Sequence, residues 1–93
     1  MKTRAYNSPP VKYRNRVEII AQILKAVNVN GGTTKAKIMY GAFLTYEQLM
    51  NYLRLLIERD LLQPNASNTF TITEKGIDFL KAYDELDKEE IVL

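Results

Sequence analysis

The sequence from Thr34 to Asp60 places two helical patterns almost next to each other, and this spacing restricts the fold more than any other stretch. Thr34 can cap a short helix, and we expect Gly41 to end it, because glycine adopts the left-handed cap conformation at no steric cost. Thr45 opens a second helix with Gln48 three positions later, which is the pattern of a capping box. Two helices joined by so short a turn are typical of a helix-turn-helix.

The second of these helices has an apolar and a polar side. The three-and-four spacing predicts a buried stripe of Tyr46, Leu49, Met50, Leu53, Leu56 and Ile57. The opposite side carries Glu47, Gln48, Asn51, Tyr52, Arg54, Glu58 and Arg59. Amide, phenol and guanidinium groups can hydrogen-bond base edges and phosphates in a DNA major groove. Any helix at a protein surface has a polar side, so this pattern alone is equally consistent with a DNA-binding face and with an ordinary solvent-exposed face.

The composition excludes several classes of protein. A chain of 93 residues, 46% hydrophobic and 26% charged, fits one globular domain. It contains no cysteine and no histidine. A disulfide scaffold, a thiolate nucleophile and a zinc finger are therefore excluded, and the usual acid–base and metal-binding side chains are missing. We expect no enzymatic activity, no cofactor, no metal and no small-molecule substrate.

The distribution of apolar residues predicts where the protein resides. No apolar run approaches the roughly 18 residues that a bilayer-spanning helix needs. The N-terminal residues 1–10 lack the apolar region of a secretory signal. We therefore expect no membrane partner, and a cytoplasmic, nucleoid-associated protein.

The charges are unevenly distributed along the chain. The net charge is +2, but residues 1–16 hold five basic residues and no acid, whereas residues 74–93 hold seven acids and three lysines. The first segment is thus +5, the last −4, and residues 17–73 add +1. Such polarity fits a molecule that approaches a polyanion with one end.

Outside the helix-turn-helix, the pattern predicts an arm, a helix, a hairpin and a final helix. Residues 1–11 read as a flexible basic arm, and residues 12–93 as the domain. A core helix is expected over about residues 11–28, with Val17, Ile20, Ile23, Leu24 and Val27 on its buried side. Residues 61–64 and 69–72 are strand candidates separated by turn formers, with Pro64 at an edge or at the start of the turn. Thr73 then caps the last helix.

The last helix contains a short heptad pattern. Its members are Phe79, Tyr83, Leu86 and Leu93, with the polar Glu90 also at a seven-residue spacing. Such a seam can join two subunits, so these residues are the dimerisation candidates. The alternative is that the final turns fray among their many carboxylates.

The order helix, helix, turn, helix, hairpin, helix is that of a winged helix-turn-helix, an α+β fold that is mainly α-helical. The runs KIMYGAFLTYEQLMNYLRLLIERDLL (37–62) and FTITEKGIDFL (70–80) resemble those of the small archaeal winged-helix DNA-binding proteins. That group includes chromatin-associated proteins and predicted transcription regulators, several of which dimerise through an antiparallel C-terminal coiled coil. The resemblance covers about residues 17–86 and implies that Thr45, Gln48, Asn51 and Tyr52 face the major groove. The wing tip, residues 65–69, departs from a basic wing because it holds no Lys or Arg.

The leading hypothesis is a homodimeric protein that binds double-stranded DNA as a transcription regulator or chromatin component. Base edges would be contacted by Thr45, Gln48, Asn51, Tyr52 and Arg54. Phosphates would be contacted by Lys12, Arg14, Arg16, Lys35, Lys37 and Arg59. The alternative is a winged-helix module that binds other proteins, which the acidic Glu47 and Glu58 and an exposed Leu55 favour.

Overall fold

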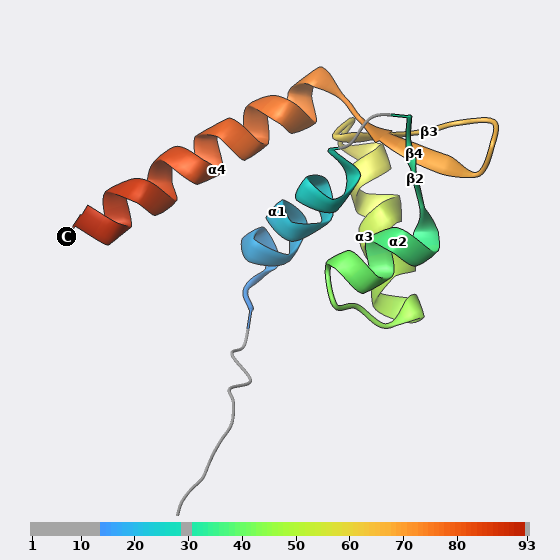
Figure 1. Ribbon diagram of the computed structural model, residues 1–93, viewed down its shortest axis with the longest axis horizontal. Coiled ribbons are helices and arrows are strands. Elements are labelled where there is room, and N and C mark those ends of the chain that lie inside the picture. Colours follow the sequence, from blue (N-terminus) through green and yellow to red (C-terminus); the bar gives the residue numbers. More distant parts are fainter. Residues whose placement is uncertain (1–13, 29–30, 93) are drawn as a thin grey trace, which may run out of the picture.

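The computed structural model describes residues 14–28 and 31–92, with side chains through Leu86. Its elements are α1 (Arg16–Val27), β2 (Thr33–Thr34), α2 (Lys35–Gly41), α3 (Tyr46–Glu58), β3 (Leu62–Pro64), β4 (Thr69–Ile72) and α4 (Glu74–Val92). Helices α1, α2 and α3 pack together, and the small sheet lies at one end of this group (Figure 1). The expected α+β fold, a winged helix-turn-helix, is confirmed.

Helix α1 begins later than its apolar pattern suggests. The Asn15 side chain accepts a hydrogen bond from the Glu18 N–H at 2.7 Å, and the Glu18 carboxylate accepts one from the Asn15 N–H at 2.9 Å. This capping box fixes the first helical residue at Arg16. Residues 14 and 15 are not helical, so the prediction that this helix starts near residue 11 is wrong. The predicted arm of residues 1–11 and the phosphate candidate Lys12 lie outside the described residues.

The two caps predicted for the helix-turn-helix are confirmed. Thr34 Oγ1 accepts from the Lys37 N–H at 3.3 Å at the start of α2. At the start of α3, the Gln48 N–H donates to Thr45 Oγ1 at 3.2 Å, and the Thr45 N–H donates to Gln48 Oε1 at 3.0 Å. Both helices thus start where the local sequence satisfies their first N–H groups.

Helix α2 ends at Gly41 as predicted, but the left-handed conformation expected of this glycine is wrong. Gly41 is the last helical residue, and the left-handed conformation belongs to Phe43, whose φ is 56°. A Cβ on Gly41 would lie 3.1 Å from the Cβ of Ala26, so the glycine lets α1 and α2 approach closely. Packing between helices, rather than the turn itself, explains the glycine at this position.

One hydrophobic core lies between the helices and the sheet. Its buried apolar residues are Ile20, Ala21, Ile23, Leu24, Val27, Ile38, Ala42, Leu44, Leu49, Leu53, Leu56, Leu62, Phe70 and Leu80. On α3 the buried stripe is narrower than predicted because α2 and β3 cover only one side of the helix. Tyr46 and Ile57 are exposed, as is Val17 on α1, whereas Leu55 is half-buried against the core. The predictions that Tyr46, Ile57 and Val17 are buried and that Leu55 is exposed are therefore wrong.

The sheet has three antiparallel strands in the order β2–β4–β3. The predicted hairpin is β3–β4, with Leu62 opposite Ile72 and Pro64 opposite Phe70. Pro64 ends the edge strand β3, as its missing N–H requires. Strand β2 was not predicted, because its two residues are too few to show a periodic pattern, and it pairs with the other side of β4.

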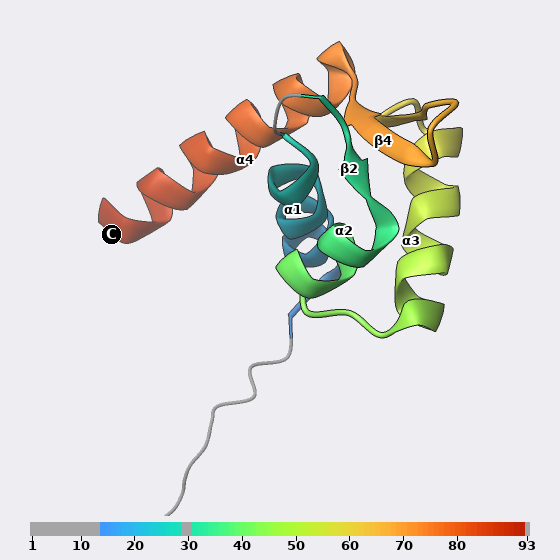
Figure 2. The same cartoon turned by 45° about the vertical axis from the view of Figure 1, so that its right-hand side comes forward.

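Helix α4 begins at the sheet and runs along α1 (Figure 2). The Gly76 N–H donates to Thr73 Oγ1 at 3.0 Å, which confirms Thr73 as the cap. The Thr73 hydroxyl in turn donates to the carbonyl oxygen of Asp60 at 2.7 Å. Further along, Lys25 Nζ lies 3.5 Å from Asp84 Oδ1 and 5.6 Å from the ring centre of Tyr83. These contacts connect the exposed sides of α4 and α1.

Within residues 14–28 and 31–92, no helix combines the length and the apolar character that crossing a bilayer requires.

Candidate nucleic-acid interface

The outer side of α3 is a continuous polar surface. Its exposed residues are Glu47, Gln48, Asn51, Arg54 and Glu58, which recur at helical spacing opposite the buried stripe. Three of the five base-edge candidates, Gln48, Asn51 and Arg54, therefore lie together on one side. We call this set of five exposed residues the α3 face.

Two members of the predicted reading set differ in the groups that they can offer. Gln48 Oε1 already accepts the Thr45 N–H in the capping box, which occupies one of its two lone pairs and fixes the orientation of the amide. Thr45 Oγ1 accepts the Gln48 N–H and keeps its hydroxyl hydrogen. Bidentate recognition of adenine needs an acceptor and a donor from one amide. Asn51, exposed in the middle of α3, is the better placed amide for such a contact.

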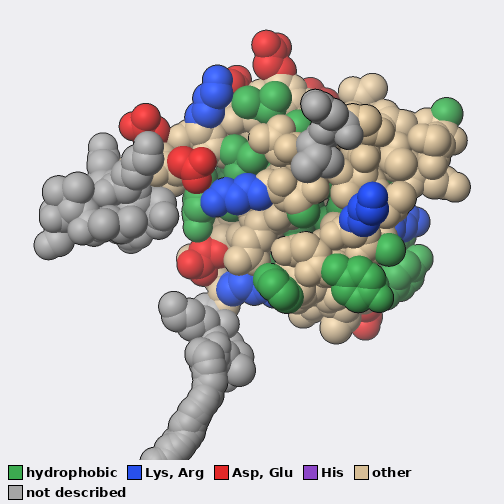
Figure 3. Space-filling view, viewed as in Figure 1, with side chains coloured by type: hydrophobic (Ala, Val, Ile, Leu, Met, Phe, Trp, Pro, Cys, Tyr) green, Lys and Arg blue, Asp and Glu red, His purple; other side chains and the backbone are tan. Residues whose placement is uncertain are grey.

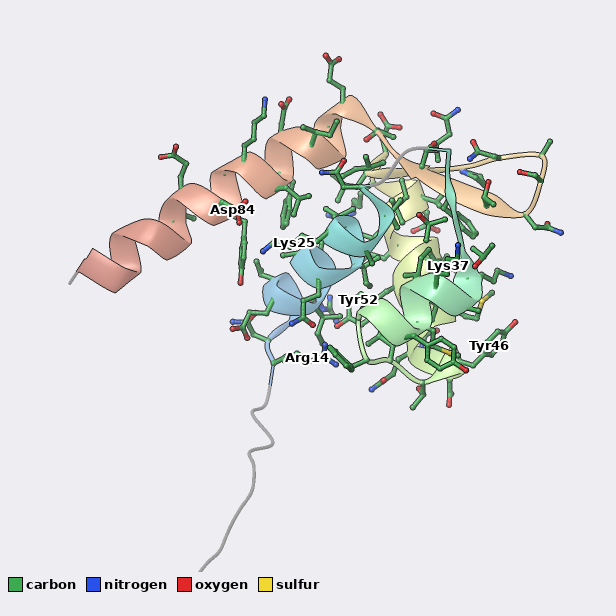
Figure 4. All side chains as sticks on the ribbon, in the orientation of Figure 1. Arg14, Lys25, Lys37, Tyr46, Tyr52 and Asp84 are labelled. Atoms are coloured by element: carbon green, nitrogen blue, oxygen red, sulfur yellow. The ribbon has the colours of Figure 1, made fainter. Side chains whose placement is uncertain are left out.

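Tyr52 lies at the margin of the α3 face. Its side chain is half-buried and packs against the core. It lines a surface hollow of about 340 Å³ together with Arg16, Asn51 and Leu55 (Figure 4 labels Tyr52). The α1 cation Arg16 and the phenol of Tyr52 are thus brought to the same side of α3.

Five exposed cations that could contact DNA come from α1, α2 and α3 or its end. They are Arg16 at the start of α1, Lys35 and Lys37 in the first turn of α2, and Arg54 and Arg59 on and after α3. Lys35 also lines a hollow of about 500 Å³ between α2 and the wing, whose other walls include Pro64 and Asn68. Lys35 thus lies beside the β3–β4 hairpin, which is the wing, and the wing side of this hollow offers amide and hydroxyl groups but no positive charge.

Arg14 has a structural role that the sequence did not reveal. Its guanidinium donates to the carbonyl oxygens of Ala42 at 2.6 Å and Phe43 at 3.0 Å, and also to the Gln22 side chain. The half-buried Arg14 thus ties the start of α1 to the turn between α2 and α3. These partners lie 8, 28 and 29 positions away along the chain, so no local pattern could have identified them.

Sequence reasoning also missed an exposed aromatic group at the same turn. Tyr40, Phe43 and Tyr46 are 73%, 77% and 61% exposed. Hydrophobic side chains gather side by side over the end of α2 and the start of α3 (Figure 3). We call these three residues the aromatic cluster. The signal in the sequence was an aromatic residue at every third position across a turn.

The dimerisation candidates on α4 do not form one free stripe. Phe79 and Tyr83 are half-buried against the core of the same chain. Leu86 is 65% exposed, and Leu93 lies outside the described residues. Of the four candidates, Leu86 is thus the described side chain that remains available for a partner.

Comparisons with known proteins agree with this geometry. Residues 13–91 match the family model described as winged helix-turn-helix. An uncharacterized protein of Methanocaldococcus jannaschii is 36% identical over 78 residues, which are 84% of this chain but 36% of that protein. The chain thus spans about a third of the length of this relative.

Two solved structures share the fold. Sso10a-2, a DNA-binding protein from Sulfolobus solfataricus, is 26% identical with a TM-score of 0.69, over 83% of this chain and 82% of that one. The O-methyltransferase NcsB1 of neocarzinostatin biosynthesis is 25% identical with a TM-score of 0.54, over 68% of this chain and 21% of the enzyme. The resemblance to small archaeal DNA-binding proteins is thereby confirmed. The chain belongs to the winged helix-turn-helix family.

Proposed function

We propose that this protein binds double-stranded DNA through the α3 face and acts as a transcription regulator or chromatin-associated protein. The observation that carries the proposal is the exposure of Gln48, Asn51 and Arg54 together on α3, with no other described element packed over them. The similarity to a DNA-binding protein over most of both chains supports it. We place this binding role, without catalysis, in the cytoplasm on the nucleoid.

In the proposed complex, cations position the domain and α3 contacts the bases. Arg16, Lys35, Lys37 and Arg59 contact phosphates, while Asn51 and Arg54 reach base edges in the major groove. Gln48, Thr45 and Tyr52 contribute donors at the margin of the α3 face. Lys12 and the basic arm extend the phosphate contacts. Arg14 is left out of this set because its donors are engaged by the turn.

Substitutions on the α3 face test the proposal. Asn51→Ala and Arg54→Ala should each weaken binding to a mixed-sequence duplex about tenfold, since a good base contact contributes about 1–3 kcal/mol. Glu58→Gln on the same face should instead strengthen binding, because it removes a negative charge next to the DNA phosphates. Gel-shift titrations of the three variants and the wild type measure this. Equal affinities in all four would contradict the proposal.

A protein-binding module is the second candidate, and two observations favour it. The aromatic cluster is exposed, and Glu47 and Glu58 lie on the α3 face. The same fold also occurs as a fifth of an O-methyltransferase. A module of this class should give no gel shift with duplex DNA at low salt, so the wild-type titration alone separates the two candidates.

We also propose that two copies associate through α4. The exposed Leu86 supports this proposal because a helical seam needs apolar side chains outside the protein's own core. Leu86→Glu should shift sedimentation equilibrium toward the monomer, whereas Leu86→Met should sediment like the wild type. A wild type that sediments as a monomer at all concentrations would contradict the proposed dimer.

A further inference from the structure

The aromatic cluster has no role in the binding scheme above, although it adjoins the start of α3. We propose that Tyr40, Phe43 and Tyr46 pack against the C5-methyl groups of thymine in the major groove and give the protein a preference for A·T base pairs. The inference rests on the proposed duplex binding and adds the base chemistry that this surface recognises.

The backbone at Phe43 is the first support. The Leu44 N–H donates to the Met39 carbonyl at 3.0 Å and the Phe43 N–H to the Tyr40 carbonyl at 3.4 Å. These bonds form the Schellman motif that ends α2, in which the left-handed position is usually glycine. Here Phe43 holds that position with φ 56°. Among the described residues, the other non-glycine residues with positive φ are Asp60 and Asn68, types that tolerate it well.

A bulky residue persists in such a conformation only when its surroundings impose it. The Arg14 guanidinium contributes to this constraint, since it donates to the carbonyl oxygens of Ala42 and Phe43. The buried neighbours Ala42 and Leu44 constrain the same turn, whereas the Phe43 side chain itself is 77% exposed and gains little from packing. The fold thus bears the backbone strain of Phe43 while directing its ring outward. A ring kept at such a position is explained by a contact with another molecule.

The position of the cluster connects it to DNA. Tyr46 is the first residue of α3, and Asn51 follows on the same helix. Lys37 lies on α2, one turn before Tyr40, and Figure 4 places Lys37 above Tyr46. The Arg14 guanidinium lies 3.0 Å from the Phe43 carbonyl oxygen. An apolar surface beside cations and next to a candidate reading helix matches a polyanion that also presents apolar groups.

The thymine methyl is the apolar group that base edges present in the major groove, and phenylalanine is among the side chains that contact it. Burying one methyl group corresponds to about a three- to fourfold gain in affinity. Two or three such contacts give roughly tenfold or more. Cytosine offers no methyl at this position, so the cluster would discriminate by burial without requiring a hydrogen bond.

Replacement of thymine by uracil tests the inference directly. An A·T-rich duplex and the same duplex with deoxyuridine differ only in the C5-methyl groups. The wild type should bind the uracil duplex more weakly by roughly tenfold or more. A G·C duplex carrying 5-methylcytosine should in turn bind more tightly than the unmodified G·C duplex, which separates methyl recognition from the shape of A·T-rich DNA.

Phe43→Gly supplies the matched variant. Glycine is favoured at φ 56°, so its Tm should equal or exceed that of the wild type. Its thymine-to-uracil affinity ratio should fall by about three- to fourfold, the share of one methyl contact. Phe43→Tyr keeps the ring and should keep most of the wild-type ratio.

The outcomes separate the inference from the proposed function. Equal wild-type affinity for the thymine and uracil duplexes would overturn the methyl contact while leaving duplex binding intact. Preferential binding of single-stranded DNA would overturn it as well, since the rings would then stack on unpaired bases. If the wild type shifts none of these duplexes, both the inference and the proposed function fail.

Discussion

Gly76→Ala is expected to lower the free energy of unfolding by about 2–3 kcal/mol, because the new methyl group has no space. A Cβ at this buried position would lie 2.5 Å from the carbonyl oxygen of Leu61 and 2.7 Å from Cγ1 of Ile72. The Leu61 carbonyl cannot move freely, since it accepts the Thr73 N–H at 3.1 Å. The midpoint of thermal unfolding should fall by on the order of 10 °C or more.

Gly41→Ala is the matched control for this substitution, because it also places an alanine at a helical glycine. Its Cβ would meet only the Ala26 methyl at 3.1 Å, and the helix propensity of alanine offsets the contact. We expect a change within about 1 kcal/mol. Urea unfolding of both variants compares the two, and a Gly76→Ala protein as stable as Gly41→Ala would refute the close packing of α4 on the α3–β3 connection.

The double substitution of Lys35 and Lys37 by Glu should weaken duplex binding on the order of 100-fold, if each lysine contacts one phosphate. For the wild type, about five phosphate contacts predict a slope of log affinity against log salt of about −4 to −5, and the variant should lose about two units of that slope. Stability should not fall. Both positions lie in the first turn of α2, where acids are favoured, and Glu at position 37 can complete a capping box with Thr34.

Lys75 and Lys81 provide the control for net charge. Both are exposed on α4, and replacing both by Glu also takes the net charge from +2 to −2. If the lysines of α2 contact DNA, the α4 variant should keep most of its affinity and most of its salt slope. Salt titrations by fluorescence anisotropy measure both quantities. Equal losses in the two variants would show that only total charge matters.

The sequence predicted the parts of the fold that depend on neighbours in the chain. The caps at Thr34, Thr45 and Thr73 satisfy N–H groups three residues away, and the hairpin follows from turn formers between two short strands. For the same reason, the exposed residues on α3 could be predicted except at the margins of the face. Tyr46 was predicted to be buried and is exposed, whereas Tyr52 was predicted to be exposed and is half-buried.

The parts that were missed depend on contacts between distant segments. Gly41 ends α2 as predicted, but the reason for a glycine there is the close approach to Ala26 of α1 and not a left-handed turn. Phe43 holds the left-handed position with help from Arg14, which is 29 residues earlier. Strand β2 forms because Thr33 and Thr34 can pair with β4, and two residues show no period of their own. Tertiary packing decided each of these positions against the local preference.

The short strand β2 also gives the domain a mechanical property. Thr34 pairs with Thr69 near the wing tip and at the same time caps α2. A force applied to the wing is therefore transmitted through main-chain pairing to the first turn of α2, which carries Lys35 and Lys37. We therefore expect the β3–β4 hairpin and these two lysines to move together. If a bound duplex bends and displaces the hairpin, Lys35 and Lys37 should be displaced with it.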